Sequence, residues 1–204
     1  MKGKDTYKTI KKPSEGLYKE KGSRFLAFAY PVETRIKAEE RINELRKKYH
    51  DARHHCFAWV IKSDRSDCRS NDDGEPSNSA GQPILGQINA NQLTNILIVV
   101  VRYFGGTLLG VGGLIRAYRS AAADAIEKSE IITRTINRIY QLNFSYDLTG
   151  SVMKIVQSPG INVLEQKFDE RVMIKISIRK SLAEGTLNKL KSVVGLEVEH
   201  LGAG

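Results

Sequence analysis

The sequence contains no long apolar run, and its longest strictly aliphatic stretch is Ile96–Val101. A membrane-spanning helix needs about 20 such residues, so we do not expect an integral membrane protein. The first residues, MKGKDTYKTIKKPSE, have no apolar core and do not resemble a secretory signal. The two cysteines, Cys56 and Cys68, are too few for a disulfide framework in a chain of 204 residues. The expected compartment is therefore a reducing cytoplasm.

Acidic residues are scarce in the middle of the chain, where none occurs between Glu75 and Asp124. Arg102, Arg116 and Arg119 all lie in that stretch. The whole chain has 32 Lys and Arg against 23 Asp and Glu, a net charge of +9. A basic surface favours nucleic acid or another polyanion as a partner, although excess charge can also serve solubility alone. The same two interpretations apply to the N-terminal lysines, which are Lys2, Lys4, Lys8, Lys11 and Lys12.

Apolar residues make up 41% of the chain and charged residues 27%, which is typical of a globular protein. The apolar pattern predicts an α+β fold with two domains, residues 1–134 and residues 135–204. The second domain shows the order β-α-β-β-α-β, which is the split βαβ or ferredoxin-like plan. The expected strands are residues 17–32, 54–61, 96–103, 135–146, 161–168, 171–179 and 194–200, and the expected helices are residues 34–49, 79–91, 114–128, 148–157 and 182–190.

A glycine-rich segment follows the expected buried strand at residues 96–103 and leads into the expected helix at residues 114–128. Glycines let backbone N–H groups approach a ligand, a helix N-terminus attracts anions, and arginines add charge-assisted donors for phosphate. Alternatively, the glycines only permit tight packing, since neither a Walker motif nor a G-x-G-x-x-G fingerprint is complete. The candidate anion-binding residues are Arg102, Gly105, Gly106, Gly110, Gly112, Gly113, Arg116 and Arg119.

Three carboxylates, Asp72, Asp73 and Glu75, lie within four residues around Gly74. A weak magnesium site is one interpretation, although the ligand spacing of an EF-hand loop is absent. The better-supported alternative is a turn in which the carboxylates accept backbone N–H bonds and Ser79 caps the following helix. We therefore predict no metal site and no cofactor.

His54 and Cys56 are two residues apart on an expected strand, so they share one face. This arrangement could form a thiol–imidazole nucleophile or, with His50, His55 and Cys68, a zinc site. The sequence shows neither a third orienting group nor a paired C-x-x-C motif. A small buried hydrophobe is the simpler role for Cys56, and we predict no catalytic residue.

Several motifs occur together, in order, along residues 17–120. They are Lys21–Ala27, His54–Cys56, Asp73–Ser77, Ala80, Gly81, Pro83, Val99–Gly106, Leu109, Gly110 and Arg116–Tyr118. In this combination the chain resembles the IMPACT/YigZ family, and its whole length is similar to a two-domain bacterial member. The family-motif residues that carry over, without an established catalytic role, are His54, Asp73, Gly74, Glu75, Arg102, Gly105, Gly106, Gly110 and Arg116.

The resemblance implies that the first domain has the superfold shared by GHMP kinases and domain IV of elongation factor G. It implies that the second resembles the ferredoxin-like C-terminal domain of that factor. Eukaryotic relatives regulate translation, so one hypothesis is a non-enzymatic protein that binds RNA, the ribosome or a translation factor. A second is an enzyme acting on a phosphorylated small molecule or nucleotide, with Asp73 or Glu75 holding magnesium or acting as a base. A third is a protein-interaction module.

Overall fold

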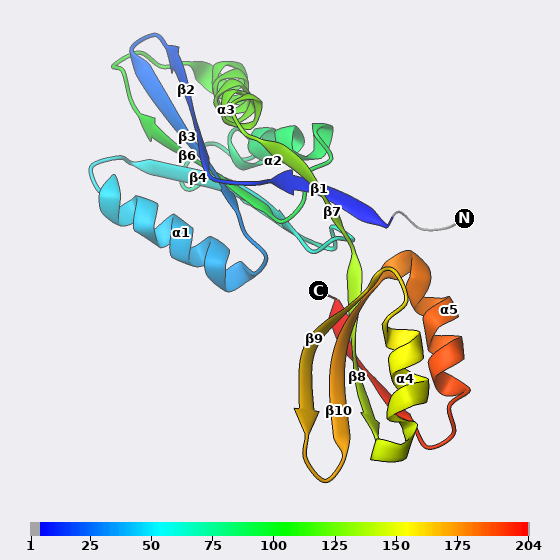
Figure 1. The fold of residues 1–204 in the computed structure, drawn as a ribbon. Helices are drawn as coiled ribbons and strands as arrows, with labels where there is room; N and C mark the ends of the chain where they lie inside the picture. Colours follow the sequence, from blue (N-terminus) through cyan, green and yellow to red (C-terminus); the bar gives the residue numbers. More distant parts are fainter. Residues whose placement is uncertain (1–4, 204) are drawn as a thin grey trace. The chain divides into compact units, whose positions relative to one another are not determined.

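The computed structural model describes residues 5–203, which divide into two compact units with separate hydrophobic cores (Figure 1). The first unit comprises Tyr7–Arg134. The second comprises the chain from Thr135 onward together with Asp5 and Thr6. This division differs from the expected one at the N-terminus, where we had assigned all early residues to the first domain.

The first unit is built around a five-stranded antiparallel sheet with helices on both faces. Its elements are β1 (Thr6–Ile10), β2 (Ser14–Glu20), β3 (Ser23–Pro31), α1 (Arg35–Lys48), β4 (His54–Ile61), β5 (Asp67–Asn71), α2 (Gly81–Ala90), β6 (Ile96–Tyr103), α3 (Gly110–Glu127) and β7 (Ile131–Thr135). The strand order is β2-β3-β6-β4-β5, and β1 pairs separately with β7. Helices α2 and α3 cover one face of the sheet and α1 covers the other (Figure 1).

The aliphatic run of the sequence forms β6, which occupies the middle of this sheet. Successive side chains of a strand point to opposite faces, so an unbroken apolar run fits a strand that is covered on both sides. The side chains that pack with α2 and α3 are Ile96, Ile98 and Val100, and those that pack with α1 are Leu97, Val99 and Val101. Both β4 and β6 have the bounds expected from the sequence.

Five strands of the first unit differ from the expectation, and two of them, β1 and β7, lie where no strand was expected. The expected strand at residues 17–32 is a hairpin of β2 and β3, in which Lys21 and Gly22 have φ of 46° and 77°. Two consecutive positive φ values are typical of the two-residue turns that match strand twist. In addition, β5 lies in a polar region for which no strand was expected. Because β5 is short and polar, it shows no alternation of apolar residues from which it could be predicted.

Helix α3 begins at Gly110, earlier than the expected residue 114. Gly110, Gly112 and Gly113 therefore belong to the first turn of the helix, and the glycine-rich loop shortens to residues 104–109. Within the described part of the chain, no helix is long and apolar enough to cross a membrane.

The second unit has a four-stranded antiparallel sheet with two helices on one face (Figure 1). Its elements are β8 (Asn137–Phe144), η1 (Tyr146–Leu148), α4 (Thr149–Val156), β9 (Ile161–Phe168), β10 (Val172–Arg179), α5 (Lys180–Lys191) and β11 (Glu197–Ala203). The strand order is β11-β8-β10-β9. Apart from the single turn η1, the chain therefore follows the order β-α-β-β-α-β.

Asp5 groups with the second unit because its carboxylate binds the start of α5. The backbone N–H of Ser181 donates to Oδ1 (2.8 Å), and the Ser181 hydroxyl donates to Oδ2 (2.7 Å), which also accepts from Arg179. These bonds, chiefly the one from the Ser181 side chain, hold the pKa of the Asp5 carboxyl below its usual value. The backbone N–H of Ile136 donates to the Asp5 carbonyl as well (2.8 Å).

Candidate nucleic-acid interface

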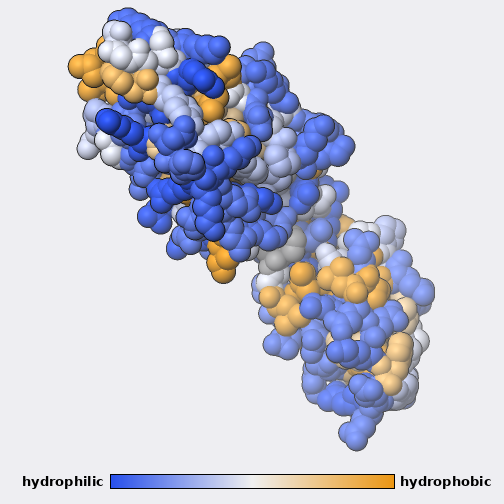
Figure 2. Space-filling view, turned by 90° about the vertical axis from the view of Figure 1, so that its left-hand side faces the viewer, coloured by the Kyte–Doolittle hydropathy of each residue, from blue (hydrophilic) through white to orange (hydrophobic). Residues whose placement is uncertain are grey.

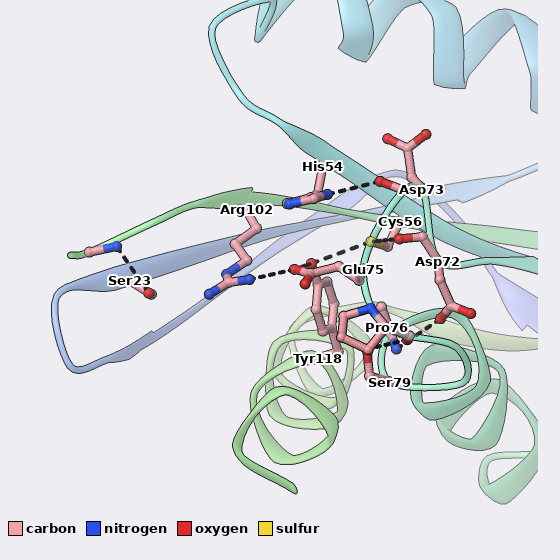
Figure 3. A network of polar contacts seen from close by, with 12 residues as sticks. Ser23, His54, Cys56, Asp72, Asp73, Glu75, Pro76, Ser79, Arg102 and Tyr118 are labelled. Carbon is pink, nitrogen blue, oxygen red and sulfur yellow. Dashed lines mark hydrogen bonds and ion pairs between the residues drawn. The ribbon is translucent and has the colours of Figure 1, made fainter. Parts of the chain in front are cut away.

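The loop between β5 and α2 carries the three carboxylates, and Glu75 in this loop forms a buried ion pair. Arg102 Nη1 donates to Glu75 Oε1 at 2.7 Å, and the two side chains are only 7% and 4% exposed. The Tyr118 hydroxyl of α3 donates to the same oxygen at 2.7 Å (Figure 3). Removing one member of such a pair would leave a charge buried without its partner, so the pair is a strong structural constraint.

Arg102 is therefore not the external phosphate contact that we expected, because its charge is already offset by Glu75. The carbon at the centre of its guanidinium lies 5.5 Å from the centroid of the Phe25 ring and 5.7 Å from that of Phe104. Among the described residues, Arg102 Nε has no hydrogen-bond partner although it is buried. Arg102 thus joins β6 to the loop while one of its donors remains unused.

Asp72 caps α2, which is the role that we expected of Ser79. Its Oδ1 accepts from the backbone N–H groups of Ala80 (3.0 Å) and Gly81 (2.8 Å). The Ser79 hydroxyl instead donates to the carbonyl of Pro76 at 2.6 Å (Figure 3). The first N–H groups of a helix lack acceptors within the helix. The Asp72 carboxylate, which lies in the preceding loop, is the acceptor for two N–H groups at the start of α2.

Asp73 is engaged through both of its carboxylate oxygens. Oδ1 accepts from Arg46 Nη2 at 2.8 Å, and Oδ2 accepts from the backbone N–H of His55 at 2.7 Å. All three carboxylates of the loop therefore bind protein groups. Asp72 and Asp73 accept backbone N–H bonds as in the turn interpretation, whereas Glu75 accepts from side chains. In the part of the chain that the structure describes, no three His, Cys, Asp or Glu residues are grouped so that they could hold a metal ion.

His54 and Cys56 share a face of β4 but contact different carbonyls. His54 Nδ1 lies 2.8 Å from the Asp73 carbonyl oxygen. A carbonyl only accepts, so Nδ1 carries the hydrogen and Nε2 of the neutral ring is an acceptor. The Cys56 thiol lies 3.0 Å from the Asp72 carbonyl oxygen. Burial raises the pKa of this thiol far above its usual range, which leaves it protonated and unsuited to be a nucleophile.

The glycines of the loop have two different roles. Gly105 donates its backbone N–H to the Ser23 hydroxyl (3.1 Å), and a Cβ on Gly105 would lie 1.9 Å from the carbonyl carbon of Gly22. The loop can approach the β2–β3 hairpin this closely only without a side chain, as the packing alternative requires. Gly106 and Gly110 have positive φ (85° and 66°), and a Cβ on either would meet open space.

The first turn of α3 lies beside the Arg116 guanidinium. It contains no acidic residue, and no side chain of the described residues caps it. A Cβ on Gly112 or Gly113 would lie 4.0 or 3.9 Å from the guanidinium nitrogens of Arg116. The Arg116 side chain is 67% exposed, and its ion-pair distance to Glu20 is 4.0 Å. Arg119 is exposed one turn further along the same face, so two cations and the helix N–H groups form one anion-attracting surface.

Apolar side chains project from the same segment. Phe104, Leu108 and Val111 are 53%, 83% and 52% exposed. The face of the first unit that Figure 2 shows is largely hydrophilic, with apolar groups confined to small areas. Sequence reasoning missed these residues because single apolar residues in a loop and in the first turn of a helix form no periodic pattern. Their position next to a glycine-rich turn was the only available signal.

The N-terminal lysines contribute little that can be placed at this surface. Lys2 and Lys4 lie outside the described residues, and Lys8 lies in β1. Lys11 forms an ion pair with Glu130 at 2.8 Å, which offsets its charge, and Lys12 is exposed.

The family model of the Impact N-terminal domain matches residues 21–126, which contain the ion pair, the glycine-rich loop and Arg116. IMPACT family member YvyE of Bacillus subtilis is 33% identical over 167 residues, which cover 82% of this chain and 77% of that protein. IMPACT family member YigZ of Escherichia coli is 33% identical over 161 residues, or 78% of each chain. The chain belongs to the IMPACT family.

The similarity extends to eukaryotes and to a solved structure. The protein IMPACT homolog of Saccharomyces cerevisiae is 36% identical over 96 residues, which cover 45% of this chain and 36% of that protein. A crystal structure described only as that of a hypothetical protein has a TM-score of 0.73 and 26% identity, covering 96% of this chain and 97% of the other. The shared architecture thus includes the second unit as well as the family domain.

Proposed function

We propose that this protein is a non-enzymatic cytoplasmic protein that binds RNA of the translation machinery and modulates translation. The observation that carries the proposal is the exposed Arg116 guanidinium beside the uncapped first turn of α3. Membership of the IMPACT family and the net charge of +9 support the same direction.

The phosphate contacts differ from those expected from the sequence alone. Arg116 and Arg119 lie three residues apart on α3, so both can contact neighbouring phosphates of one strand. The backbone N–H of Gly112, which has no acceptor within the helix, adds a donor at the positive end of the helix dipole. Arg102 contributes indirectly, because its pairing with Glu75 fixes the end of β6, the strand that precedes the glycine-rich loop. Binding of this kind depends steeply on salt and discriminates weakly between sequences.

The same proposal includes the fold relationships. The first unit would share the superfold of GHMP kinases and domain IV of elongation factor G, and the second would correspond to the C-terminal domain of that factor. The β-α-β-β-α-β order from β8 to β11 and the strand order β11-β8-β10-β9 support the second correspondence. Fold similarity alone does not assign function, so the proposal rests on the surface of α3.

Binding of a fluorescent single-stranded RNA, followed by anisotropy at low salt, tests the proposal. We expect the Arg116→Gln/Arg119→Gln variant to bind about tenfold more weakly, because it loses two phosphate contacts. The matched control is Lys37→Gln/Lys47→Gln on α1, which removes the same charge from the opposite side of the sheet. Equal losses in the two variants would mean that only net charge matters, which contradicts the proposed surface.

A further inference from the structure

A groove of about 590 Å³ lies at the end of the sheet where β4 begins and β6 ends. Its polar side includes His54 and Arg102, and its apolar side includes Phe104 and Leu108. Its volume falls in the range of about 300–1,000 Å³ that is typical of ligand sites.

The polar side offers a hydrogen-bond acceptor next to a largely buried cation. His54 and Arg102 are directly opposite each other on β4 and β6, so their side chains leave the sheet on the same face (Figure 3). His54 Nδ1 is used as a donor to the Asp73 carbonyl, which leaves Nε2 of the neutral ring as an acceptor. Arg102 also lines the groove, but its Nε, which has no partner among the described residues, is buried.

The apolar side offers an aromatic ring that is held in place. The Arg102 guanidinium lies 5.7 Å from the centroid of the Phe104 ring, and Phe104 remains 53% exposed. The same guanidinium contacts the buried Phe25 ring, so Phe104 is attached to the core through a cation–π contact. An exposed aromatic ring with one side fixed in this way is a platform on which a second planar group can stack.

We propose that this groove binds an unpaired nucleobase, which stacks on Phe104 and directs a donor of its edge to His54 Nε2. Every nucleobase has a planar face and an edge with neighbouring donors and acceptors, whereas a phosphate has neither. The inference rests on the proposed function in one respect, since the phosphates of the same strand would reach Arg116 and Arg119.

Three ligands distinguish the sources of the base: a single-stranded RNA, a duplex of the same sequence, and 5′-mononucleotides. We expect Phe104→Leu to weaken binding of the single strand by about tenfold, because it keeps an apolar side chain but removes the stacking face. Phe104→Tyr, the matched control, keeps the ring and should bind as wild type does. Neither substitution should change binding of the duplex, whose bases are already stacked. Thermal melting should show that both variants are folded.

Each outcome supports or overturns the groove proposal, the proposed function or both. If Phe104→Leu binds the single strand as wild type does while Arg116→Gln/Arg119→Gln binds it more weakly, the groove proposal is overturned and the proposed function stands. If wild type binds neither RNA, the proposed function fails. Saturable binding of a mononucleotide that Phe104→Leu abolishes would then support the groove as a nucleotide site. Absence of mononucleotide binding as well would overturn it.

Discussion

Arg102 Nη1 lies 2.7 Å from Glu75 Oε1, and neither side chain is more than 7% exposed. Their pairing joins the end of β6 to the loop before α2, and Tyr118 adds α3 to the same contact. Three of the segments through which the chain resembles its family, those that contain Glu75, Arg102 and Tyr118, therefore meet at one place in the fold. Glu75, Arg102 and Tyr118 form a buried polar cluster. Through Tyr118 this cluster anchors α3, the helix whose surface we propose to bind RNA.

Removing the charge of Glu75 should destabilise the first unit strongly. Glu75→Gln leaves the Arg102 guanidinium buried without its counter-ion, which destabilises proteins by about 3–5 kcal/mol. Glu44→Gln breaks an exposed pair with Arg41, whose side chains are 49% and 59% exposed, and should cost less than about 1 kcal/mol. Urea unfolding measures both. Similar losses in the two variants would show that the buried pair has no special structural role.

The glycines at the end of β6 should differ sharply in their tolerance of alanine. Gly105→Ala places a Cβ 1.9 Å from the Gly22 carbonyl carbon, so the backbone must move and the melting temperature should fall by several degrees. Gly112→Ala meets only the flexible end of Arg116 at 4.0 Å within a helix, where alanine is favoured by about 0.5–1 kcal/mol. Thermal unfolding of the two variants provides the comparison, and the reverse order would contradict it.

The sequence predicted the elements that depend on local pattern. The aliphatic run of β6 and the apolar β4 showed their burial on both faces, and the alternating elements of the second unit showed its order. What the sequence could not show was which charges neutralise each other. Glu75 and Arg102 are 27 residues apart, and only the fold brings them within hydrogen-bonding distance. From the sequence alone, the exposed Arg116 and the buried Arg102 were therefore equally good candidates for binding phosphate.

The sequence also could not show which hydroxyl or carboxyl group caps the start of α2. Ser79 occupied the expected capping position by spacing, whereas Asp72 reaches the helix from eight residues before Ala80 because the loop turns back. Positive φ at Asp73 (43°) and Gly74 (86°) produces that turn. Such a backbone conformation is encoded by a single glycine and its neighbour, so spacing rules that assume a direct approach to the helix fail here.

His55 should make the stability of the first unit depend on mildly acidic pH. Burial lowers the pKa of His55 below its ordinary value of 6.5, although Asp73 opposes the shift. The unfolded chain therefore binds the proton more readily, so stability is full above about pH 6.5 and falls as the pH decreases through the folded-state pKa. His55→Gln should reduce the slope of unfolding free energy against pH between about 7.5 and 5.5.

The control for this pH dependence is His50→Gln, which changes an exposed histidine and should keep the slope of the wild type. Titration of the carboxylates is common to all three proteins and cancels in the comparison. A His55→Gln variant with the slope of the wild type would contradict the account, whatever its absolute stability.

The most direct test of the α3 surface is the salt dependence of RNA binding. For a single strand, log K falls with log salt with a slope of about 0.7 per phosphate contacted. We predict that Arg116→Gln/Arg119→Gln lowers the magnitude of this slope by about 1.4, which corresponds to two lost contacts, while Lys37→Gln/Lys47→Gln leaves it unchanged. A slope that is the same in wild type and in Arg116→Gln/Arg119→Gln would contradict the claim that these guanidinium groups bind phosphate.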